Sequence, residues 1–269
     1  MTDLTDDSQY LVGRNFRETA RLNGQHFAIN LHLGYGLHPS VPIHDGMKIA
    51  DIGTGTGVWI LELADKYPTV VFEGYDVSSA AFPPRHVWGE NVSFAELDAL
   101  QQVPDEMKGQ YDVVHMRLLC SFVRGNDPSK LVNMAKSLLK EGGYLQWEES
   151  IRDPSLLQVQ SAIDFERMYE KAWQALNLQF DWPEHLPEIL ATHGFDVLHA
   201  RCSGLNRAAA WLWTPVYLQS CAGVLAELRQ VGFDTPAEEI EEALHRIYVD
   251  AQQGNVFGWR FSSVLARMR

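Results

Sequence analysis

A glycine-rich turn between an apolar strand and a helix is the feature that most constrains this chain. Residues 48–59 read KIADIGTGTGVW, so that Gly53, Gly55 and Gly57 follow the strand directly. Glycine has no Cβ, which lets the backbone turn tightly and approach a ligand closely. The third glycine comes one position earlier than in the G-x-G-x-x-G turn of dinucleotide enzymes, and position 58 is Val. The spacing therefore predicts a nucleotide-type cofactor other than NAD.

The charge and cysteine content limit the partners and the compartment. The 269 residues carry a net charge of −13 without a run of basic residues, which disfavours DNA and RNA as partners. The three cysteines are far apart and form neither a metal motif nor a disulfide framework, so we expect reduced thiols in a cytoplasmic protein. We see no leader sequence, no apolar run of the roughly 18 residues that a membrane span needs, and no His/Cys/Asp cluster for a metal.

Apolar strands alternate with helical segments through the first half of the chain, which predicts a parallel sheet with helices on both faces. The expected strands are 48–52, 70–75, 92–96, 111–116, 143–148, 195–202 and 255–268. The expected helices between the first five strands are 57–66, 79–86, 117–123 and 128–140. The predicted fold class is therefore α/β, with a seven-stranded, mostly parallel, doubly wound sheet.

Three regions are expected along the chain. Residues 1–45 should form a helical cap, because the apolar residues of 8–34 have helical spacing. Residues 46–150 should contain the cofactor-binding core, and residues 151–269 should complete the sheet. A helical lid is expected as an insertion at about 205–253. The helices expected in the last region are 155–178, 183–193, about 216–231, and one that begins near Thr235.

Four groups of polar residues should converge at the carboxyl ends of the first four strands, where ligands bind in open α/β sheets. The first group is the glycine turn with Asp51. An acid that ends the next strand, Asp76, can accept two ribose hydroxyls. Asp98 follows strand three and can accept from an adenine amine. The fourth is the end of strand four, residues 112–117. A helix N-cap for Asp76 and a turn position for Asp98 are the simpler alternatives.

Five strings carry a resemblance to a known family: YLVGR (10–14), RLxxQH (21–26), IADIGTGTGVW (49–59), QYDVVHMRLL (110–119) and LLKEGGYLQWEE (138–149). Over about residues 45–150 the chain resembles class I methyltransferases that use S-adenosylmethionine (SAM). It is most similar to the fungal secondary-metabolism branch, which includes gliotoxin-type amide N-methyltransferases and global regulators. The resemblance implies a Rossmann-like methyltransferase fold with SAM as cofactor.

The methionyl carboxylate of SAM needs a cation, for which Arg14 and Arg117 are the candidates. A surface salt bridge is the alternative for either arginine. The expected cofactor contacts are Asp51, Gly53, Gly55, Gly57, Asp76, Val77, Asp98, Ala99, Arg14 and Arg117.

Methyl transfer from a sulfonium is an in-line displacement that the protein promotes mainly by positioning and desolvation. A general base is needed only when the acceptor must lose a proton. The candidates are His115 at the end of strand four, His26 on the cap, and Glu148 or Glu149 at the end of strand five. Histidine suits neutral pH because its pKa is about 6.5. The alternatives are core packing for the histidines and a solvated strand end for the glutamates.

Aromatic residues in or near the expected lid predict an apolar pocket for a hydrophobic or aromatic small-molecule acceptor. These residues are Trp147, Trp173, Trp211, Trp213 and Tyr217. Ordinary core packing is the alternative, and a homodimer is left open. The predicted function is methyl transfer to an O, N or S atom of a secondary metabolite. The alternatives are a SAM-binding regulator that acts through partners and a pericyclase or isomerase that uses the fold without methyl transfer.

Overall fold

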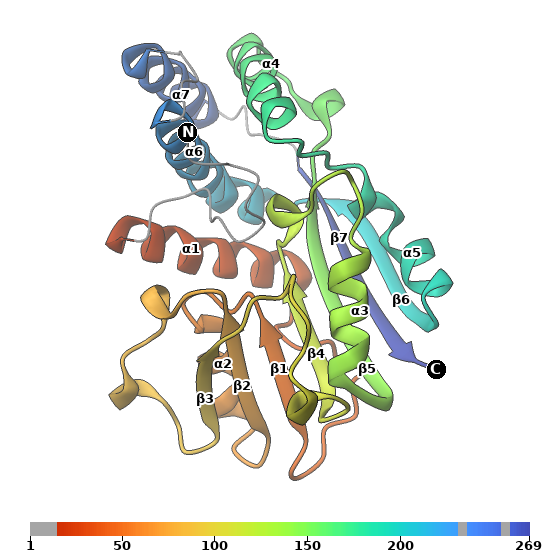
Figure 1. Ribbon diagram of the computed structural model, residues 1–269. Helices are drawn as coiled ribbons and strands as arrows, with labels where there is room; N and C mark the ends of the chain where they lie inside the picture. The colour runs from red at the N-terminus through yellow and green to blue at the C-terminus, as the bar shows by residue number, and fades with distance from the viewer. Residues whose placement is uncertain (1–14, 231–235, 254–258) are drawn as a thin grey trace.

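The computed structural model describes residues 15–230, 236–253 and 259–269. Its centre is a seven-stranded sheet with the order β3-β2-β1-β4-β5-β7-β6, as Figure 1 shows. The strands are β1 (Lys48–Ile52), β2 (Val71–Asp76), β3 (Val92–Glu96), β4 (Tyr111–Arg117), β5 (Leu139–Ile151), β6 (Phe195–Gly204) and β7 (Arg260–Met268). The first five strands are parallel, and β7 runs antiparallel to both of its neighbours. The predicted fold class is confirmed.

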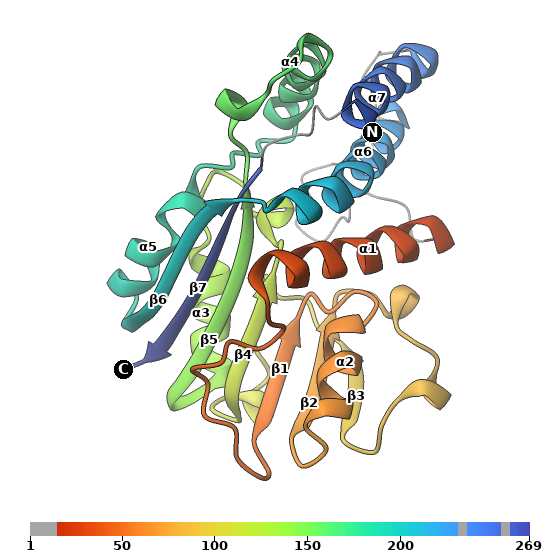
Figure 2. The same ribbon diagram turned by 180° about the vertical axis from the view of Figure 1, so that it is seen from behind.

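Helices cover both faces of the sheet and its upper edge. The helices are α1 (Phe16–Leu33), α2 (Val58–Lys66), α3 (Ser129–Leu138), α4 (Gln160–Ala175), α5 (Leu186–Thr192), α6 (Arg207–Gln230) and α7 (Ala237–Gln252). Figure 1 shows α3 and α5 in front of the sheet, and Figure 2, seen from behind, shows α2 on the other face. In both views α1 lies across the carboxyl ends of the parallel strands, with α4, α6 and α7 above it.

The cap helix α1 has defined ends. The Asn15 side chain accepts hydrogen bonds from the backbone nitrogens of Arg17 and Glu18, which satisfies donors that the first turn leaves open. Gly34 ends the helix with a φ of 84°, the left-handed conformation that glycine adopts without strain. The inner face of α1 packs in one apolar cluster with α4, α6 and α7. The cap is therefore held mainly by the helices above it.

Two of the helices expected next to the cofactor turn are short 3₁₀ turns. The segment expected as a helix at 79–86 contains the turns Ser79–Ala81 and Arg85–Val87, because Pro83 and Pro84 between them interrupt regular hydrogen bonding. The helix expected at 117–123 is only the turn Cys120–Phe122. Strand β4 continues to Arg117, and Leu118 then takes a positive φ of 55°, which excludes a helix at that point.

Three further boundaries differ from those expected. Strand β5 begins at Leu139 and continues to Ile151, because it pairs with both β4 and β7. Helix α6 begins at Arg207 and contains Pro215, so the tryptophans at 211 and 213 lie on a helix. Strand β7 begins at Arg260, and residues 255–258 of the expected strand lie outside the described residues. Within the described part, no helix has the length and apolarity that crossing a bilayer requires.

Candidate functional site

The glycine turn after β1 requires glycine for conformation and for space. Gly53, Gly55 and Gly57 have φ values of 72°, 54° and 69°. A Cβ on Gly53 would lie 2.7 Å from Cδ2 of Leu119, and a Cβ on Gly57 would lie 2.5 Å from the ring of Phe94. Both distances are shorter than real Cβ contacts. The turn can therefore pass close to its surroundings only because the side chains are missing.

Two carboxylates hold this turn in place. Asp76, at the end of β2, accepts a hydrogen bond from the Gly55 backbone nitrogen at 2.9 Å. Asp51, at the end of β1, accepts from the Thr54 hydroxyl at 2.7 Å through Oδ2. Asp76 lines the larger of two neighbouring pockets, together with Gly53 and Gly55. Asp51 is buried and lines the smaller pocket.

The larger pocket has a volume of about 380 Å³ and runs from the glycine turn to the lid helices. Residues of α1, among them Arg21 and Gln25, form one wall, and the turn at 118–122 forms another. Its far end is aromatic, and the rings there are Trp173, Phe180, Trp213, Tyr217 and Trp259. The smaller pocket, of about 60 Å³, lies between α1 and the glycine turn. A single cavity thus joins the nucleotide-type turn to an aromatic chamber.

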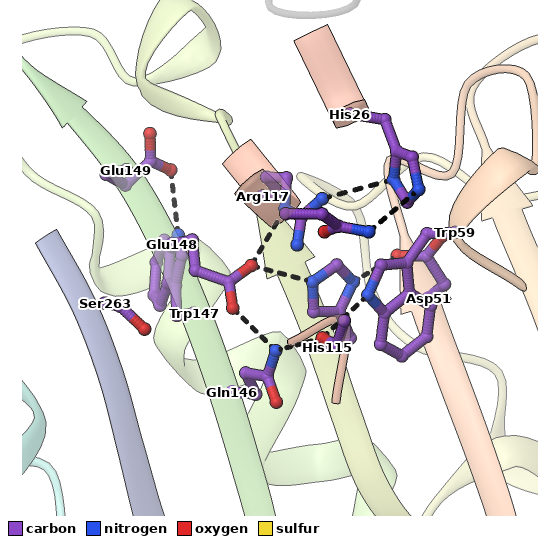
Figure 3. Close-up of polar contacts among 12 residues, drawn as sticks. His26, Asp51, Trp59, His115, Arg117, Gln146, Trp147, Glu148, Glu149 and Ser263 are labelled. Carbon is purple, nitrogen blue, oxygen red and sulfur yellow. Dashed lines mark hydrogen bonds and ion pairs between the residues drawn. The ribbon is translucent and has the colours of Figure 1, made fainter. Parts of the chain in front are cut away.

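Figure 3 shows a chain of charged side chains that crosses the sheet from Asp51 to Glu148 and continues through Arg117. Nδ1 of His115 lies 2.7 Å from Oδ1 of Asp51, and its Nε2 lies 2.9 Å from Oε2 of Glu148. The same Glu148 oxygen accepts from Nε of Arg117 at 2.8 Å. Nη1 of Arg117 reaches Nδ1 of His26 on α1 at 3.4 Å. The network therefore connects three neighbouring strands, β1, β4 and β5, to the cap helix.

The two carboxylates hold His115 in its cationic form. Burial favours the neutral imidazole, but Glu148 and Asp51 outweigh it and raise the pKa of His115. Burial also opposes ionisation of Glu148, yet Arg117 and His115 lower the pKa of that carboxyl to about 2. The His115 ring stacks on Trp59 with the centroids 3.8 Å apart. Both ring nitrogens of the imidazolium donate to carboxylates, so neither offers a lone pair to a substrate proton.

The residues expected as general bases do not lie together at the wall of the larger pocket. His115 and Glu148 are 1% and 0% exposed, and neither lines the larger pocket, although His115 lines the smaller one. They form a buried support for Arg117. His26 lines the smaller pocket, and its Nε2 lies 2.7 Å from Oε2 of Glu62. Burial and the nearby Arg117 lower the pKa of His26 despite Glu62, so the ring is neutral near pH 7.

One side-chain nitrogen of Arg117, Nη2, is buried without a hydrogen-bond partner among the described residues. Arg117 contributes to the walls of both pockets. A guanidinium has five N–H donors, and burying one without a partner costs free energy. A bound anion is the partner that this position fits.

Glu149 holds the turn that follows β4. Its carboxylate accepts from the backbone nitrogens of Leu119 and Cys120 at 2.8 and 3.3 Å, and from Nε1 of Trp147 at 2.8 Å. It is fully buried, and burial raises its pKa to about 7 although these donors favour the ionised form. Because residues 118–122 line the larger pocket, Glu149 shapes that wall although it does not line the pocket itself.

The raised pKa of Glu149 predicts a pH-dependent stability. The folded protein keeps this proton to about pH 7, whereas the unfolded chain releases it near 4.5, so the contribution of Glu149 is complete below pH 4.5 and is lost as the pH rises to about 7. Between these pH values, the free energy of unfolding of the wild type should fall by up to about 1.4 kcal/mol per pH unit relative to that of Glu149→Gln, whose side chain does not titrate. Urea denaturation of both proteins measures this difference, and parallel pH profiles would contradict it.

Other expected cofactor residues are not at the pocket wall. Asp98 accepts from the Leu100 backbone nitrogen at 2.9 Å, as a turn residue does, and neither Asp98 nor Ala99 lines the larger pocket. Val77 is absent from the wall, although Asp76 and Ser78 on either side belong to it. Arg14 lies outside the described residues. Sequence reasoning assigned no role to Arg21, although the RLxxQH string contains it.

Comparisons with known proteins agree with this geometry. Residues 36–200, more than half of the chain, match the model of a methyltransferase domain family. The methyltransferase grgD of a Penicillium species is 33% identical over 198 residues, which cover 70% of this chain and 69% of the relative. The N-methyltransferase gliN of Aspergillus fumigatus is 27% identical over 152 residues, which cover 55% of this chain and 53% of the relative. The chain thus spans about half the length of that N-methyltransferase.

A solved structure shows the same fold. Phosphoethanolamine N-methyltransferase 2 of Haemonchus contortus, in complex with S-adenosylhomocysteine, superposes with a TM-score of 0.53 over 92% of this chain and 52% of its own, at 15% identity. The sheet, the glycine turn and the pocket above the strand ends define a class I methyltransferase that uses SAM. The chain belongs to the methyltransferase domain family and has fungal methyltransferases among its relatives.

Proposed function

We propose that this protein transfers the methyl group of SAM to an O, N or S atom of a small, largely apolar secondary metabolite. The observation that supports this proposal is the shape of the larger pocket. One end has the glycine turn and Asp76, and the other end is walled by aromatic side chains. A donor site and an apolar acceptor site in one cavity are what an in-line transfer requires. The fungal relatives named as methyltransferases agree with it.

The cofactor is assigned to the end of the pocket below α1. We propose that Asp76 accepts the ribose hydroxyls and that the buried Nη2 of Arg117, which lacks a protein partner among the described residues, donates to the methionyl carboxylate. Bound SAM supplies a methyl group on a sulfonium, which is already a good leaving group. The protein then binds, orients and excludes water.

The charged network is assigned a positioning role. Glu148 and His26 contact Arg117 from opposite sides, at Nε and Nη1, which leaves Nη2 for the ligand. His115 fixes Glu148 and is itself fixed by Asp51. Because the neutral His26 accepts from Arg117, we propose that it aims the arginine and connects α1 to the cofactor.

Two tryptophans of α6 provide a test of the acceptor site. Trp213 is 5% exposed and lines the pocket, whereas Trp211 is 42% exposed and does not. Trp213→Ala should raise the acceptor KM at least about tenfold, because a buried aromatic ring contributes several kcal/mol of contact. Trp211→Ala should leave the KM within about twofold. Steady-state kinetics with any turned-over acceptor measures both, and equal effects of the two substitutions would contradict the assignment.

The function itself is tested with SAM that carries an isotope-labelled methyl group. The protein is incubated with a small-molecule extract and, separately, with a protein fraction of a fungal culture. Label in a low-molecular-weight product, with S-adenosylhomocysteine formed alongside, is the expected result. Label only in proteins would contradict a small-molecule acceptor. Tight SAM binding without transfer would favour the regulator, and an isomerised product without label would favour the pericyclase.

A further inference from the structure

An ion pair is buried among aromatic side chains at the lid end of the larger pocket. Arg152 directly follows β5, and Glu166 lies on α4. Nε of Arg152 donates to Oε2 of Glu166 at 2.5 Å, and its Nη2 donates to the Glu166 carbonyl oxygen at 3.3 Å. Tyr217 of α6 donates its hydroxyl to Oε1 of the same carboxylate. Both carboxylate oxygens of Glu166 thus accept hydrogen bonds, and that side chain is 5% exposed.

Fold stability alone does not explain this ion pair. Removing two charges from water costs several kcal/mol for each ion, and apolar residues of similar size are often equally stabilising. Arg152 shares the pocket wall with Val216 and Trp259, which belong to the apolar cluster of the lid. A charged pair kept at the wall of an apolar pocket is a candidate for ligand recognition.

Arg152 keeps one donor group for such a ligand. Glu166 takes Nε and Nη2, whereas Nη1 makes none of the hydrogen bonds among the described residues. Arg152 belongs to the pocket wall, and its side chain is 16% exposed. Burial disfavours the cation, but Glu166 outweighs it and raises the pKa of Arg152, so the guanidinium stays charged. The planar group therefore pairs along one edge and has N–H donors left over.

We propose that Arg152, held by Glu166 and Tyr217, binds a neutral carbonyl oxygen of the methyl acceptor, whose apolar body lies against Trp173, Trp213 and Trp259. The carbonyl is neutral because Glu166 already balances the guanidinium. A second carboxylate would add an uncompensated negative charge to a desolvated corner. An amide or ketone oxygen gains a charge-assisted hydrogen bond at no such cost. This inference rests on the proposed function, since it describes the acceptor of that reaction.

Three matched probes test it: indole, indole-3-carboxamide and indole-3-carboxylate. Their dissociation constants are measured by calorimetry with saturating S-adenosylhomocysteine, so that the cofactor end is filled. The carboxamide should bind about tenfold more tightly than indole, the effect of one hydrogen bond to a charged group. The carboxylate should bind more weakly than the carboxamide. Equal binding of carboxamide and indole, tightest binding of the carboxylate, or no binding of any probe would overturn the proposal.

Variants then assign the preference to Arg152. Arg152→Met should abolish the advantage of the carboxamide, and so should the double variant Arg152→Met with Glu166→Gln, which leaves no unpaired buried charge. Arg201→Met, an exposed position on β6, is the matched control and should retain the preference. Unchanged affinity for S-adenosylhomocysteine reports that each variant is folded. A preference that persists without Arg152 would contradict the site. Probe binding needs no turnover, so it separates this proposal from the failure of methyl transfer.

Discussion

Replacing Glu148 by alanine is expected to lower the free energy of unfolding by about 3–5 kcal/mol, the cost of removing one partner from a buried charged pair. The substitution leaves the cations of Arg117 and His115 side by side, with Asp51 as the remaining carboxylate of the network. The pKa of Glu148, lowered to about 2, means that its stabilising contribution is present above about pH 4.5 and is lost as the pH falls toward 2. Urea denaturation at pH 7 measures the loss.

Two further variants sharpen this measurement. Glu148→Gln keeps the shape and the acceptor oxygen but not the charge, so we expect an intermediate loss. Glu141→Ala, an exposed position on the same strand, should change stability by less than about 0.5 kcal/mol. If Glu148→Ala lowered the free energy of unfolding as little as Glu141→Ala does, the network would not be the buried support that we describe.

The affinity for SAM should fall about 100-fold in Asp76→Ala. The carboxylate is expected to accept two ribose hydroxyls, and each hydrogen bond to a charged group contributes about 1.5 kcal/mol or more. The same side chain holds the Gly55 backbone, so its loss also loosens the turn. Titration calorimetry with SAM and with S-adenosylhomocysteine measures the affinity.

Asp98→Ala is the matched comparison for Asp76→Ala. Asp98 is a strand-end aspartate that the sequence predicts to contact adenine, but it lies off the wall of the larger pocket. We expect its loss to change the affinity by no more than about twofold. Retained SAM affinity in Asp76→Ala would refute the ribose assignment. A large loss in Asp98→Ala would show that the adenine contact forms when the cofactor binds.

The sheet and the cofactor turn are the parts of the structure that the sequence predicts well. Apolar strands bounded by turns have a strong local pattern. Gly53, Gly55 and Gly57 all have a positive φ, and Gly53 and Gly57 also leave no room for a Cβ, so glycine is required in this turn. The order of the first five strands, β3-β2-β1-β4-β5, agrees with the general rules of doubly wound parallel sheets, whereas the antiparallel β7 between β5 and β6 lies outside those rules. The local pattern predicts a helix wrongly where a pair of prolines or a residue with positive φ interrupts the helix, as at Pro83 and Leu118.

The partners of His115 could not be predicted, because they come from distant segments. Its position at the end of β4 suggests a catalytic role, yet strand alternation does not say that Asp51 and Glu148 enclose it from the strands on either side. A histidine whose two nitrogens both donate to carboxylates behaves as a fixed cation. The ion pair of Arg152 and Glu166 could not be predicted for the same reason, since it joins the residue that follows β5 to α4.

Trp211 and Trp213 show a different limit. In an extended segment, residues two apart share a face, and the sequence expectation placed both rings in the acceptor pocket. The structure places them on α6, where each residue advances about 100° around the axis, so the two rings point in nearly opposite directions. One ring is buried at the pocket wall, and the other lies outside it.

The most direct test of a shared donor and acceptor cavity is a crystal structure of the protein with S-adenosylhomocysteine. We expect the ribose on Asp76, the carboxylate on Arg117, and the sulfur open toward the chamber that contains Trp213 and Tyr217. A sulfur that faces away from that chamber, or a cofactor bound elsewhere than below α1, would contradict it.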